Sequence, residues 1–301
     1  MDTVIVTATA LSLRSSPGIS NDNRITTLPH GQIAEVTDRS TPGWLRIQTR
    51  VGQTTLTGYS VAKYLKPERE STPSPTFKGI SAVNFAPGRY SRLDSTVGRI
   101  YPLTTPSITK RVASDSSGDK VRALRHIIDM LDVEHSARYQ PTSHSTFCNI
   151  YAYDYCYFAD AYLPRVWWTS RALVRLAQGE AVEATYGTTV RELNANALFD
   201  WLTEWGDDFG WSRVFDLDNL QHAINEGGVA VICGRRRVPS RSGHITCVAP
   251  ETAEVPALRQ AGKIVAPVQS QAGARNKRYF ATAWWVERAA EYFDCGYFLH
   301  A

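Results

Sequence analysis

Residues 144–156 read HSTFCNIYAYDYC, and this stretch places a cysteine at the predicted start of a helix. Ser143, Ser145 and Thr146 come just before Cys148 and are residue types that favour the N-cap position. Bulky aromatic residues then recur at steps of three and four, namely Phe147, Tyr151, Tyr155, Phe158 and Tyr162. This spacing predicts a helix that begins within a residue or two of Cys148.

A second face of this predicted helix carries only small side chains, those of Cys148, Ala152, Cys156 and Ala159. Such a face allows the helix to lie close against a β-sheet. A helix N-terminus carries partial positive charge and unpaired N–H groups, and both favour a thiolate over a thiol. We therefore expect Cys148 to have a lowered pKa and to act as a nucleophile. The alternative is a small buried apolar residue, the usual role of a lone cysteine.

The composition is that of an ordinary soluble globular protein with ample material for a core. The chain has 301 residues, of which 43% are hydrophobic and 21% charged. Its net charge of +4 suits an anionic partner such as a cell-wall polymer, without requiring one. No apolar run is long enough to span a bilayer, and residues 1–16 lack the pattern of a signal peptide.

The five cysteines show no pattern that would bind a metal. Neither a C-x-x-C pair nor an H-E-x-x-H motif is present, so we expect no metal and no other cofactor. Cys148 and Cys156 would lie roughly 12 Å apart along a helix, which is too far for a disulfide. We expect all five cysteines to be reduced.

Residues 1–67 have β character. Short alternating runs such as TVIVTA, QIAEVT, WLRIQT and LTGYSV are separated by turn-rich pieces, which predicts a small barrel. The segments LSLRSSPG, LPHGQIAEV, GWLRIQ and TGYSVAKYL follow one another as in bacterial Src-homology-three-like domains, which this region resembles. The resemblance implies binding to peptidoglycan cross-bridges or stem peptides. The alternative is a packing module without a ligand.

The rest of the chain divides into a linker and an α+β domain. Residues 68–118 are rich in Pro, Ser and Thr and predict a linker. From residue 119, helix-forming patterns come first and strand-forming patterns follow, which predicts helices and then an antiparallel meander. The predicted helices after the cysteine cover residues 166–177, 189–205 and 216–228. The predicted strands cover residues 229–234, 244–250, 263–271, 278–286 and 292–300.

His244 is the candidate base for Cys148. It follows Gly243 in SGHITCVAP and opens a predicted strand, so it should lie at a sheet rim within reach of a helix packed on that sheet. A cysteine on a helix followed by a histidine on a strand is the papain-like order, in which imidazole takes the thiol proton. His144 is the competing histidine, and we expect it to be an exposed loop residue.

TFCNIYAYDY, SGHITCVAP and VQSQAG together resemble the papain-like peptidoglycan hydrolases of the CHAP (cysteine, histidine-dependent amidohydrolase/peptidase) and NlpC type. The resemblance spans roughly residues 119–301. It implies Cys148 as the nucleophile, His244 as general base and then acid, and Gln271 as the residue that orients the histidine. Gln269 shares a strand face with Gln271, so periodicity alone does not choose between the two.

Two features depart from that family. Phe147–Cys148–Asn149 stands where the family more often has DCSG or a Gln–Cys pair, and the insertion between the cysteine and the sheet is long. Both leave the cleaved bond open. For the oxyanion hole we expect the backbone N–H of Cys148 and one side-chain donor, with Tyr139 as the first candidate and Asn149 as a weaker one. A packing role for Tyr139 is the alternative.

The function implied is a peptidoglycan hydrolase that forms an acyl-enzyme on Cys148, acting as an N-acetylmuramoyl-L-alanine amidase or as an endopeptidase. The expected partner is peptidoglycan, with no nucleic acid and no membrane insertion. Synthesis in the cytoplasm without a signal peptide fits an antibacterial effector, with its secretion machinery and an immunity protein, or a holin-released phage lysin. Two alternatives stay open: a thiol acyltransferase or deamidase toxin that acts on a protein, and a non-catalytic wall-binding protein.

Overall fold

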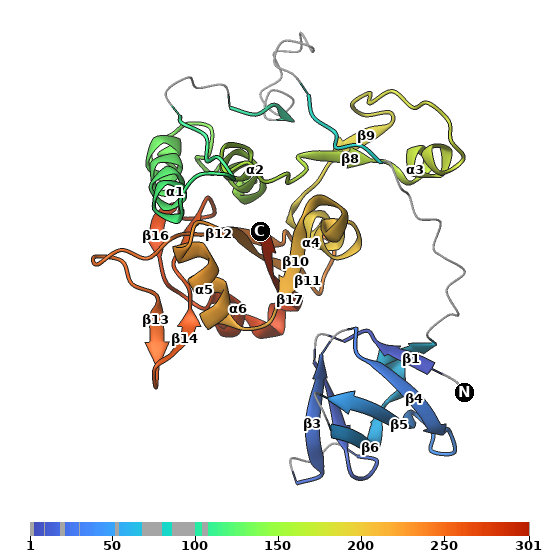
Figure 1. Cartoon of the computed structure of the whole chain (residues 1–301). Coiled ribbons are helices and arrows are strands. Elements are labelled where there is room, and N and C mark those ends of the chain that lie inside the picture. The colour runs from blue at the N-terminus through green and yellow to red at the C-terminus, as the bar shows by residue number, and fades with distance from the viewer. Residues whose placement is uncertain are drawn as a thin grey trace. The chain divides into compact units, whose positions relative to one another are not determined.

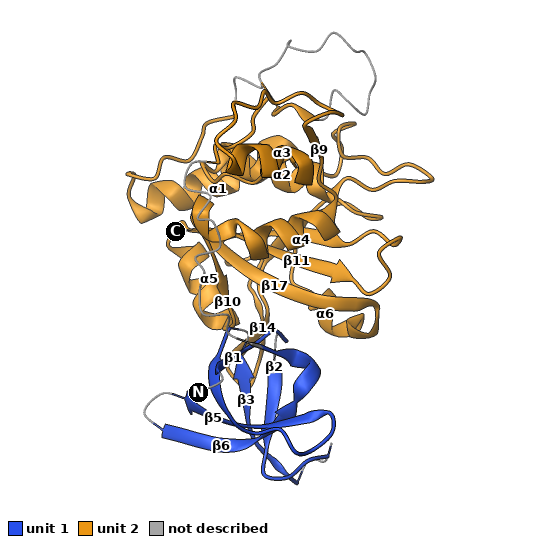
Figure 2. Cartoon of the chain, turned by 90° about the vertical axis from the view of Figure 1, so that its right-hand side faces the viewer, with its two compact units in different colours: residues 1–78 blue, residues 79–301 orange. Residues whose placement is uncertain are grey.

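The computed structural model of the chain describes residues 3–8, 10–18, 22–29, 31–51, 54–67, 80–85, 100–103 and 108–300. The chain forms two compact units, residues 1–78 and residues 79–301, which Figure 2 distinguishes by colour. Much of the predicted linker, residues 68–79, 86–99 and 104–107, lies outside the described part.

The first unit is all β, as its alternating sequence predicts. Its strands are β1 (Thr3–Val6), β2 (Ala10–Arg14), β3 (Arg24–Pro29), β4 (Ile33–Asp38), β5 (Trp44–Val51), β6 (Thr54–Val61) and β7 (Leu65–Pro67), with a 3-10 turn at Ala62–Tyr64. They form one sheet in the order β3-β2-β6-β5-β4-β1-β7. No pairing within the described residues joins β3 to β7, so this sheet is not shown to close into the predicted barrel.

Buried and exposed side chains alternate along these strands, and the buried ones form the core of the first unit. Leu45, Ile47 and Thr49 of β5 are buried, and Arg46 and Gln48 between them are exposed, because successive side chains of a strand point to opposite faces. Gly58 of β6 explains how tightly β2 and β6 pack. A Cβ atom at this position would lie 2.5 Å from the carbonyl oxygen of Arg14, so only glycine fits.

The second unit has the α+β architecture that its sequence predicts. Its main sheet is antiparallel and has the order β10-β17-β11-β12-β15-β16. The strands are β10 (Trp211–Val214), β11 (Val229–Arg236), β12 (His244–Val248), β15 (Gln269–Gln271), β16 (Lys277–Phe280) and β17 (Tyr292–His300). Strand β17, the last in sequence, pairs with both β10 and β11. The sheet is therefore not the simple meander that was predicted.

Helices cover both faces of this sheet (Figure 1). The helices of this unit are α1 (Ser117–Leu131), α2 (Cys148–Phe158), α3 (Ser170–Ala177), α4 (Ala195–Glu204), α5 (Leu217–Asn225) and α6 (Trp284–Glu287), with 3-10 turns at Gly206–Phe209 and Ala289–Glu291. Helices α2 and α4 lie on one face, where the Cys233 thiol of β11 donates to the Ala195 carbonyl at 3.3 Å. Helices α5 and α6 pack on the other face against Ala230 and Ile232.

Two predicted helices are shorter than expected because a short strand precedes each. Residues 166–177 contain β8 (Val166–Trp168) and then α3, and residues 189–205 contain β9 (Val190–Glu192) and then α4. Strands β8 and β9 pair with each other. Thr169 and Asn194 mark the true helix starts, because their side chains accept hydrogen bonds from the N–H groups of Ala172 and Ala197.

Two predicted strands also divide. Residues 263–271 split into β14 (Lys263–Ala266), which pairs with β13 (Leu258–Gln260), and β15 of the main sheet. Residues 278–286 give β16 and then helix α6. Trp284 and Trp285 are neighbours and both are buried. An extended strand would place them on opposite faces, whereas a helical turn packs both into one cluster.

Described parts of the predicted linker pack onto the second unit. The backbone N–H of Val83 donates to the Tyr162 hydroxyl at 2.8 Å. The guanidinium of Arg111, which is 4% exposed, donates to the carbonyl of Gly227 at 2.7 Å. The segments 80–85 and 108–116 therefore belong to the body that carries helix α2.

Candidate active site

Cys148 is the first residue of helix α2, and the N-cap position is held by Phe147 without any side-chain cap. The hydroxylated residues before it do not cap the helix, contrary to expectation. Instead, the Thr142 hydroxyl accepts from the backbone N–H groups of His144 and Ser145 and bends the approaching loop. The N–H of Ile150 donates to the Phe147 carbonyl and to Oδ1 of Asn149, both at 3.1 Å, so the N–H groups of Cys148 and Asn149 are the ones that can face another acceptor.

The Cys148 thiol lies in a buried pocket of backbone donors. The residue is 5% exposed, and the backbone N–H groups of Ile245, Asn149 and Cys148 itself face its sulfur. Burial raises the pKa of the thiol, and these N–H groups and the Arg165 guanidinium offset only part of the rise. The expected lowering of the Cys148 pKa is therefore wrong, because desolvation outweighs the helix N-terminus. The free protein holds a neutral thiol.

Polar contacts hold helix α2 against the sheet. The hydroxyl of Tyr151 is 2.5 Å from the Ser270 hydroxyl of β15, and Tyr155 donates to the Val248 carbonyl of β12 at 3.2 Å. On another side Asp154, which is fully buried, accepts from Arg138 at 2.5 Å. A helix tied on several sides fixes the position of its first residue, which is the cysteine.

His244 is the first residue of β12 and is half-buried. Its ring nitrogen Nε2 lies 2.7 Å from Oε1 of Gln271. The amide nitrogen of Gln271 donates to the Arg275 carbonyl at 3.1 Å, so its oxygen is turned toward the histidine. Oε1 is an acceptor, so Nε2 carries the proton and the neutral ring keeps Nδ1 as a proton acceptor.

Gly243 allows the chain just before His244 to pack closely against strand β11 and the start of helix α4. A Cβ atom there would lie 2.5 Å from Oδ1 of Asn196 and 2.7 Å from the Gly234 carbonyl oxygen. Asn196 also donates to the Arg241 carbonyl at 2.9 Å, which fastens the loop before the histidine to the start of α4. The glycine noted in the sequence is thus required by packing.

Trp284 is a residue that the sequence analysis missed. Its ring packs edge-on against the His244 imidazole, with centroids 4.9 Å apart and planes at 76°. Burial lowers the pKa of His244 to about 4, and the charges of Arg288 and Arg236 lower it further, while the Gln271 hydrogen bond opposes the shift. His244 is therefore neutral at pH 7. No sequence pattern identifies Trp284, because the apolar run of residues 278–286 predicts one strand and hides the turn of helix α6.

The structure separates the two candidate glutamines. Gln269 is fully buried and does not contact His244. Its Oε1 accepts from the Thr246 hydroxyl and the Trp284 indole, both at 2.9 Å. It therefore supports the tryptophan that packs on the histidine, whereas Gln271 touches the histidine itself.

The other candidate residues have different contacts. The hydroxyl of Tyr139 donates to Asp154 at 2.9 Å in the core, which is the packing role considered for it. The side chain of Asn149 donates to the Leu193 carbonyl at 2.9 Å and so ties the start of α2 to the segment before α4. His144 is exposed, as expected. The oxyanion donors that remain are backbone N–H groups around Cys148.

The Cys148 sulfur lies beside the backbone N–H of Ile245, the residue that follows His244, but the two side chains lie toward different faces of the sheet. Ile245, whose N–H faces the sulfur, lies on the face covered by α2, whereas His244 and Gln271 lie on the face that carries Trp284. No hydrogen bond joins the thiol and the imidazole in the part of the chain that the structure describes. Catalytic hydrogen bonds are often long without substrate and shorten when it binds.

A cavity of about 670 Å³ opens beside His244. Gln271 and Trp284 line it together with the histidine, and Thr146 of the loop before α2 forms part of its wall. Cys148 is not among the residues that line it. The cavity thus lies on the imidazole side of the pair and is large enough for part of a peptide.

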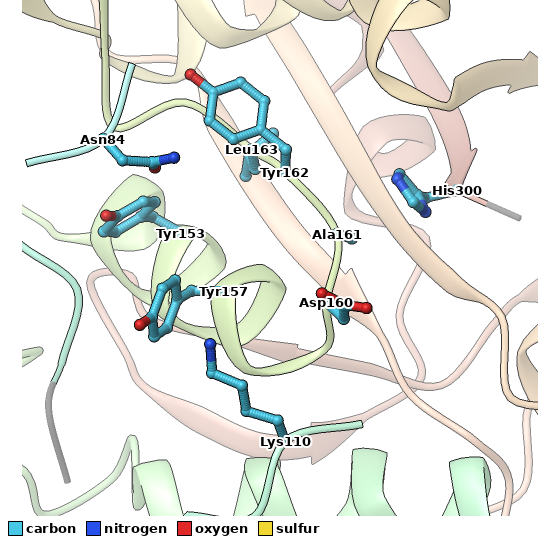
Figure 3. Close-up of a pocket in the computed structure, with 9 residues that line it drawn as sticks. All are labelled: Asn84, Lys110, Tyr153, Tyr157, Asp160, Ala161, Tyr162, Leu163 and His300. Atoms are coloured by element: carbon cyan, nitrogen blue, oxygen red, sulfur yellow. The ribbon is translucent and has the colours of Figure 1, made fainter. Parts of the chain in front are cut away.

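A second cavity, of about 360 Å³, lies at the far end of helix α2 (Figure 3). Tyr153 and Tyr157 project into it from the helix, and Lys110 places its ammonium 3.9 Å from the centroid of the Tyr157 ring. Asp160 and His300 also line it, but it contains no cysteine. It therefore offers no nucleophile of the kind considered above.

Within the described residues, no three His, Cys, Asp or Glu side chains gather closely enough to hold a metal ion. Among the helices of the same part of the chain, none has both the length and the apolar character needed to cross a membrane.

Comparison with known proteins gives little. No protein-family model matches the chain, and no curated protein matches it. Among solved structures, the chain is similar to the structure of NlpC2 from Trichomonas vaginalis, with 11% sequence identity and a TM-score of 0.23. The match covers 93% of this chain and 70% of that chain. A likeness of this size carries no argument about fold or activity.

Proposed function

We propose that this protein is a papain-like cysteine hydrolase that cleaves an amide bond of peptidoglycan. The observation that carries the proposal is a buried cysteine at a helix N-terminus whose sulfur faces the N–H of Ile245, the residue next to a histidine that Gln271 orients at 2.7 Å. A nucleophile, a base and a group that orients the base are the parts that acyl transfer requires.

The reaction uses the neutral thiol and the neutral imidazole. Nδ1 of His244 takes the thiol proton as the Cys148 sulfur attacks the amide carbonyl carbon. Backbone N–H groups at the start of α2 stabilise the oxyanion that forms. When the C–N bond breaks, the imidazolium gives its proton to the leaving amine, and a thioester remains on Cys148. A water molecule, deprotonated by His244, then hydrolyses the thioester to a carboxylic acid and restores the thiol.

The Gln271 carbonyl keeps the imidazole in the tautomer that this sequence of steps needs. Trp284 covers the ring edge-on and excludes water from that side. The buried setting of the thiol strengthens its interaction with the backbone donors during reaction. These contacts therefore all act on the His244 imidazole or on the Cys148 thiol.

The choice of peptidoglycan as substrate rests on the resemblance of the cysteine, histidine and glutamine segments and on that of residues 1–67 to bacterial Src-homology-three-like domains. We propose that the first unit binds the cell wall. Delivery as an antibacterial effector, or release as a phage lysin, is part of the same proposal. An amidase and an endopeptidase remain the two forms of the activity.

The test is to incubate the purified chain with sacculi and to identify new termini in the soluble products by mass spectrometry. A new N-terminal L-alanine on the stem peptide indicates an amidase, and a new terminus within the stem or cross-bridge indicates an endopeptidase. Sacculi that release no new product, together with acylation or deamidation of an added protein, would replace the proposal with the toxin alternative.

A further inference from the structure

The charged side chains that line the cavity beside His244 are mostly cations. Arg236, Arg275, Lys277 and Arg288 line it, and Glu287 is the carboxylate among its lining residues. The four cations come from three separate segments: β11, the β15–β16 turn with β16, and the residue after α6. Positive charge from three segments therefore converges on one cavity.

Two of these arginines are held in place by one carboxylate. Arg288 donates to Glu291 through Nε at 2.7 Å and through a terminal nitrogen at 2.8 Å, and Arg236 pairs with the same carboxylate. The two arginines lower the pKa of Glu291 to about 2, so it stays ionised. Arg236 also packs on the Tyr292 ring, with its guanidinium carbon 4.5 Å from the centroid. This pair forms a fixed wall whose charge is partly neutralised.

Arg275 and Lys277 differ from that pair. Both are exposed, and neither forms an ion pair with any residue that the structure describes. Lys277 places its ammonium 5.1 Å from the centroid of the Phe280 ring, which holds it at the cavity. Arg275 accepts the Gln271 amide through its carbonyl, so its position is coupled to the residue that orients His244. Among the residues that the structure describes, no carboxylate pairs with either of these two cations.

The position of the cavity decides which half of a substrate would meet these cations. His244 and Gln271 line it, and Cys148 does not. In the proposed reaction the acyl half becomes bound to the sulfur, and the amine half departs with the proton from the imidazole. The amine half must therefore lie on the imidazole side, where the cavity is.

We infer that this cavity binds the leaving-amine half of the substrate, and that this half carries a carboxylate recognised by Arg275 and Lys277. The inference rests on the proposed hydrolase function and adds to it the chemical class of the leaving group. A carboxylate paired with an arginine and a lysine forms charge-assisted hydrogen bonds, which are about twice as strong as neutral ones. A leaving amine with a neutral carboxamide in the same place would leave both cations unpaired.

The experiment intercepts the acyl-enzyme with competing amines, because only the leaving-amine side is then vacant. Glycine and glycinamide differ only at the carboxylate, and each would attack the thioester to form a new amide and free the Cys148 thiol. Soluble muropeptides released from sacculi by a glycosidase supply the acyl group, and mass spectrometry counts the two transfer products. The readout is the glycine-to-glycinamide product ratio in the wild type divided by that ratio in a variant.

For the Arg275→Gln/Lys277→Gln double variant we expect this quotient to be about 10 or more, because a hydrogen bond to a charged group contributes roughly that factor. Arg278→Gln is the matched control. It removes one positive charge, half of the change in the double variant, from the neighbouring position of β16, but Arg278 faces Asp129 at 3.5 Å and does not line the cavity. Its quotient should stay near 1. A thermal unfolding curve for each variant shows that the fold is retained.

The outcomes separate this inference from the function on which it rests. If muropeptides are cleaved and the quotient for the double variant is near 1, the hydrolase stands and the carboxylate site is wrong. If both variants lower the ratio equally, the effect is long-range charge and the site is also wrong. If muropeptides are not cleaved at all and no acyl-enzyme forms, the proposed function fails and the inference fails with it.

Discussion

Gln269 and Gln271 share one face of β15, yet only Gln271 reaches the histidine. Gln271→Ala should lower kcat by about 10- to 1,000-fold with little change in KM, because the amide matters mainly as charge develops on the imidazole. The loss should be smaller than for a triad aspartate, since an amide supplies orientation without charge stabilisation. Steady-state kinetics on soluble muropeptides measure both constants.

The matched variant is Gln269→Ala, from the same strand face. Gln269 supports Trp284 and makes no hydrogen bond to His244. Its loss should therefore lower the melting temperature, while kcat stays within a few-fold of the wild-type value. If Gln269→Ala loses more activity per folded molecule than Gln271→Ala, the orienting role belongs to Gln269. If both variants remain fully active, the catalytic unit is a cysteine–histidine pair alone.

The burial of His244 also determines how activity should depend on pH. The pKa of His244 is lowered to about 4, chiefly by burial, so the imidazole is a neutral base above that pH and cannot accept the thiol proton below it. The acidic limb of kcat/KM should therefore lie near pH 4, and activity at pH 5 should be close to that at pH 7. An acidic limb near the ordinary histidine value of about 6.5 would show that His244 is solvated in the working protein.

Helix α2 depends on a buried ion pair behind the cysteine. Asp154 is fully buried, and its partner Arg138 is 16% exposed. Asp154→Asn would leave the guanidinium without its charge partner, and removing one member of a buried pair typically costs about 3–5 kcal/mol of unfolding free energy. Urea denaturation followed by intrinsic fluorescence measures this loss.

The comparison for that prediction is Glu180→Gln in the Arg175–Glu180 pair, whose side chains are 42% and 46% exposed. An exposed pair contributes about 0–1 kcal/mol, so this variant should unfold almost as the wild type does. Equal losses in the two variants would mean that Asp154 does not brace the helix.

The helices and the site residues differ in how far the sequence alone predicts them. Strong periodicity predicted α1, α2 and α5, and in the structure the side chain of Asp216 caps the start of α5. Periodicity failed at residues 166–168 and 190–192, because apolar spacing continues through a strand–helix boundary and only the Thr169 and Asn194 caps mark it. For the site, the position of His244 after Gly243 and at the start of an alternating strand predicted that it lies at the rim of the sheet. The raised pKa of Cys148 and the packing of Trp284 depend on tertiary burial, which local spacing does not encode.

At the scale of the whole molecule, the two compact units divide near residue 78. The first unit has its own core of buried residues in β1 to β7, so removal of residues 1–78 should leave the second unit folded. We expect the truncated chain to cleave soluble muropeptides nearly as the full chain does, and to bind sacculi more weakly in a sedimentation assay. Equal binding of sacculi by both chains would mean that the first unit is not a wall-binding module.

The most direct test of the account is to identify the covalent intermediate. The full chain is mixed with soluble muropeptides, quenched in acid within the first turnovers and digested, and the peptide that contains Cys148 is examined by mass spectrometry. If Cys148 is the nucleophile, it carries an acyl group that hydroxylamine removes, and Cys148→Ala shows neither adduct nor turnover. Cys156→Ala, from the same helix, should keep the adduct. An acyl group on another residue, or turnover that survives in Cys148→Ala, would contradict the assignment of Cys148 as nucleophile.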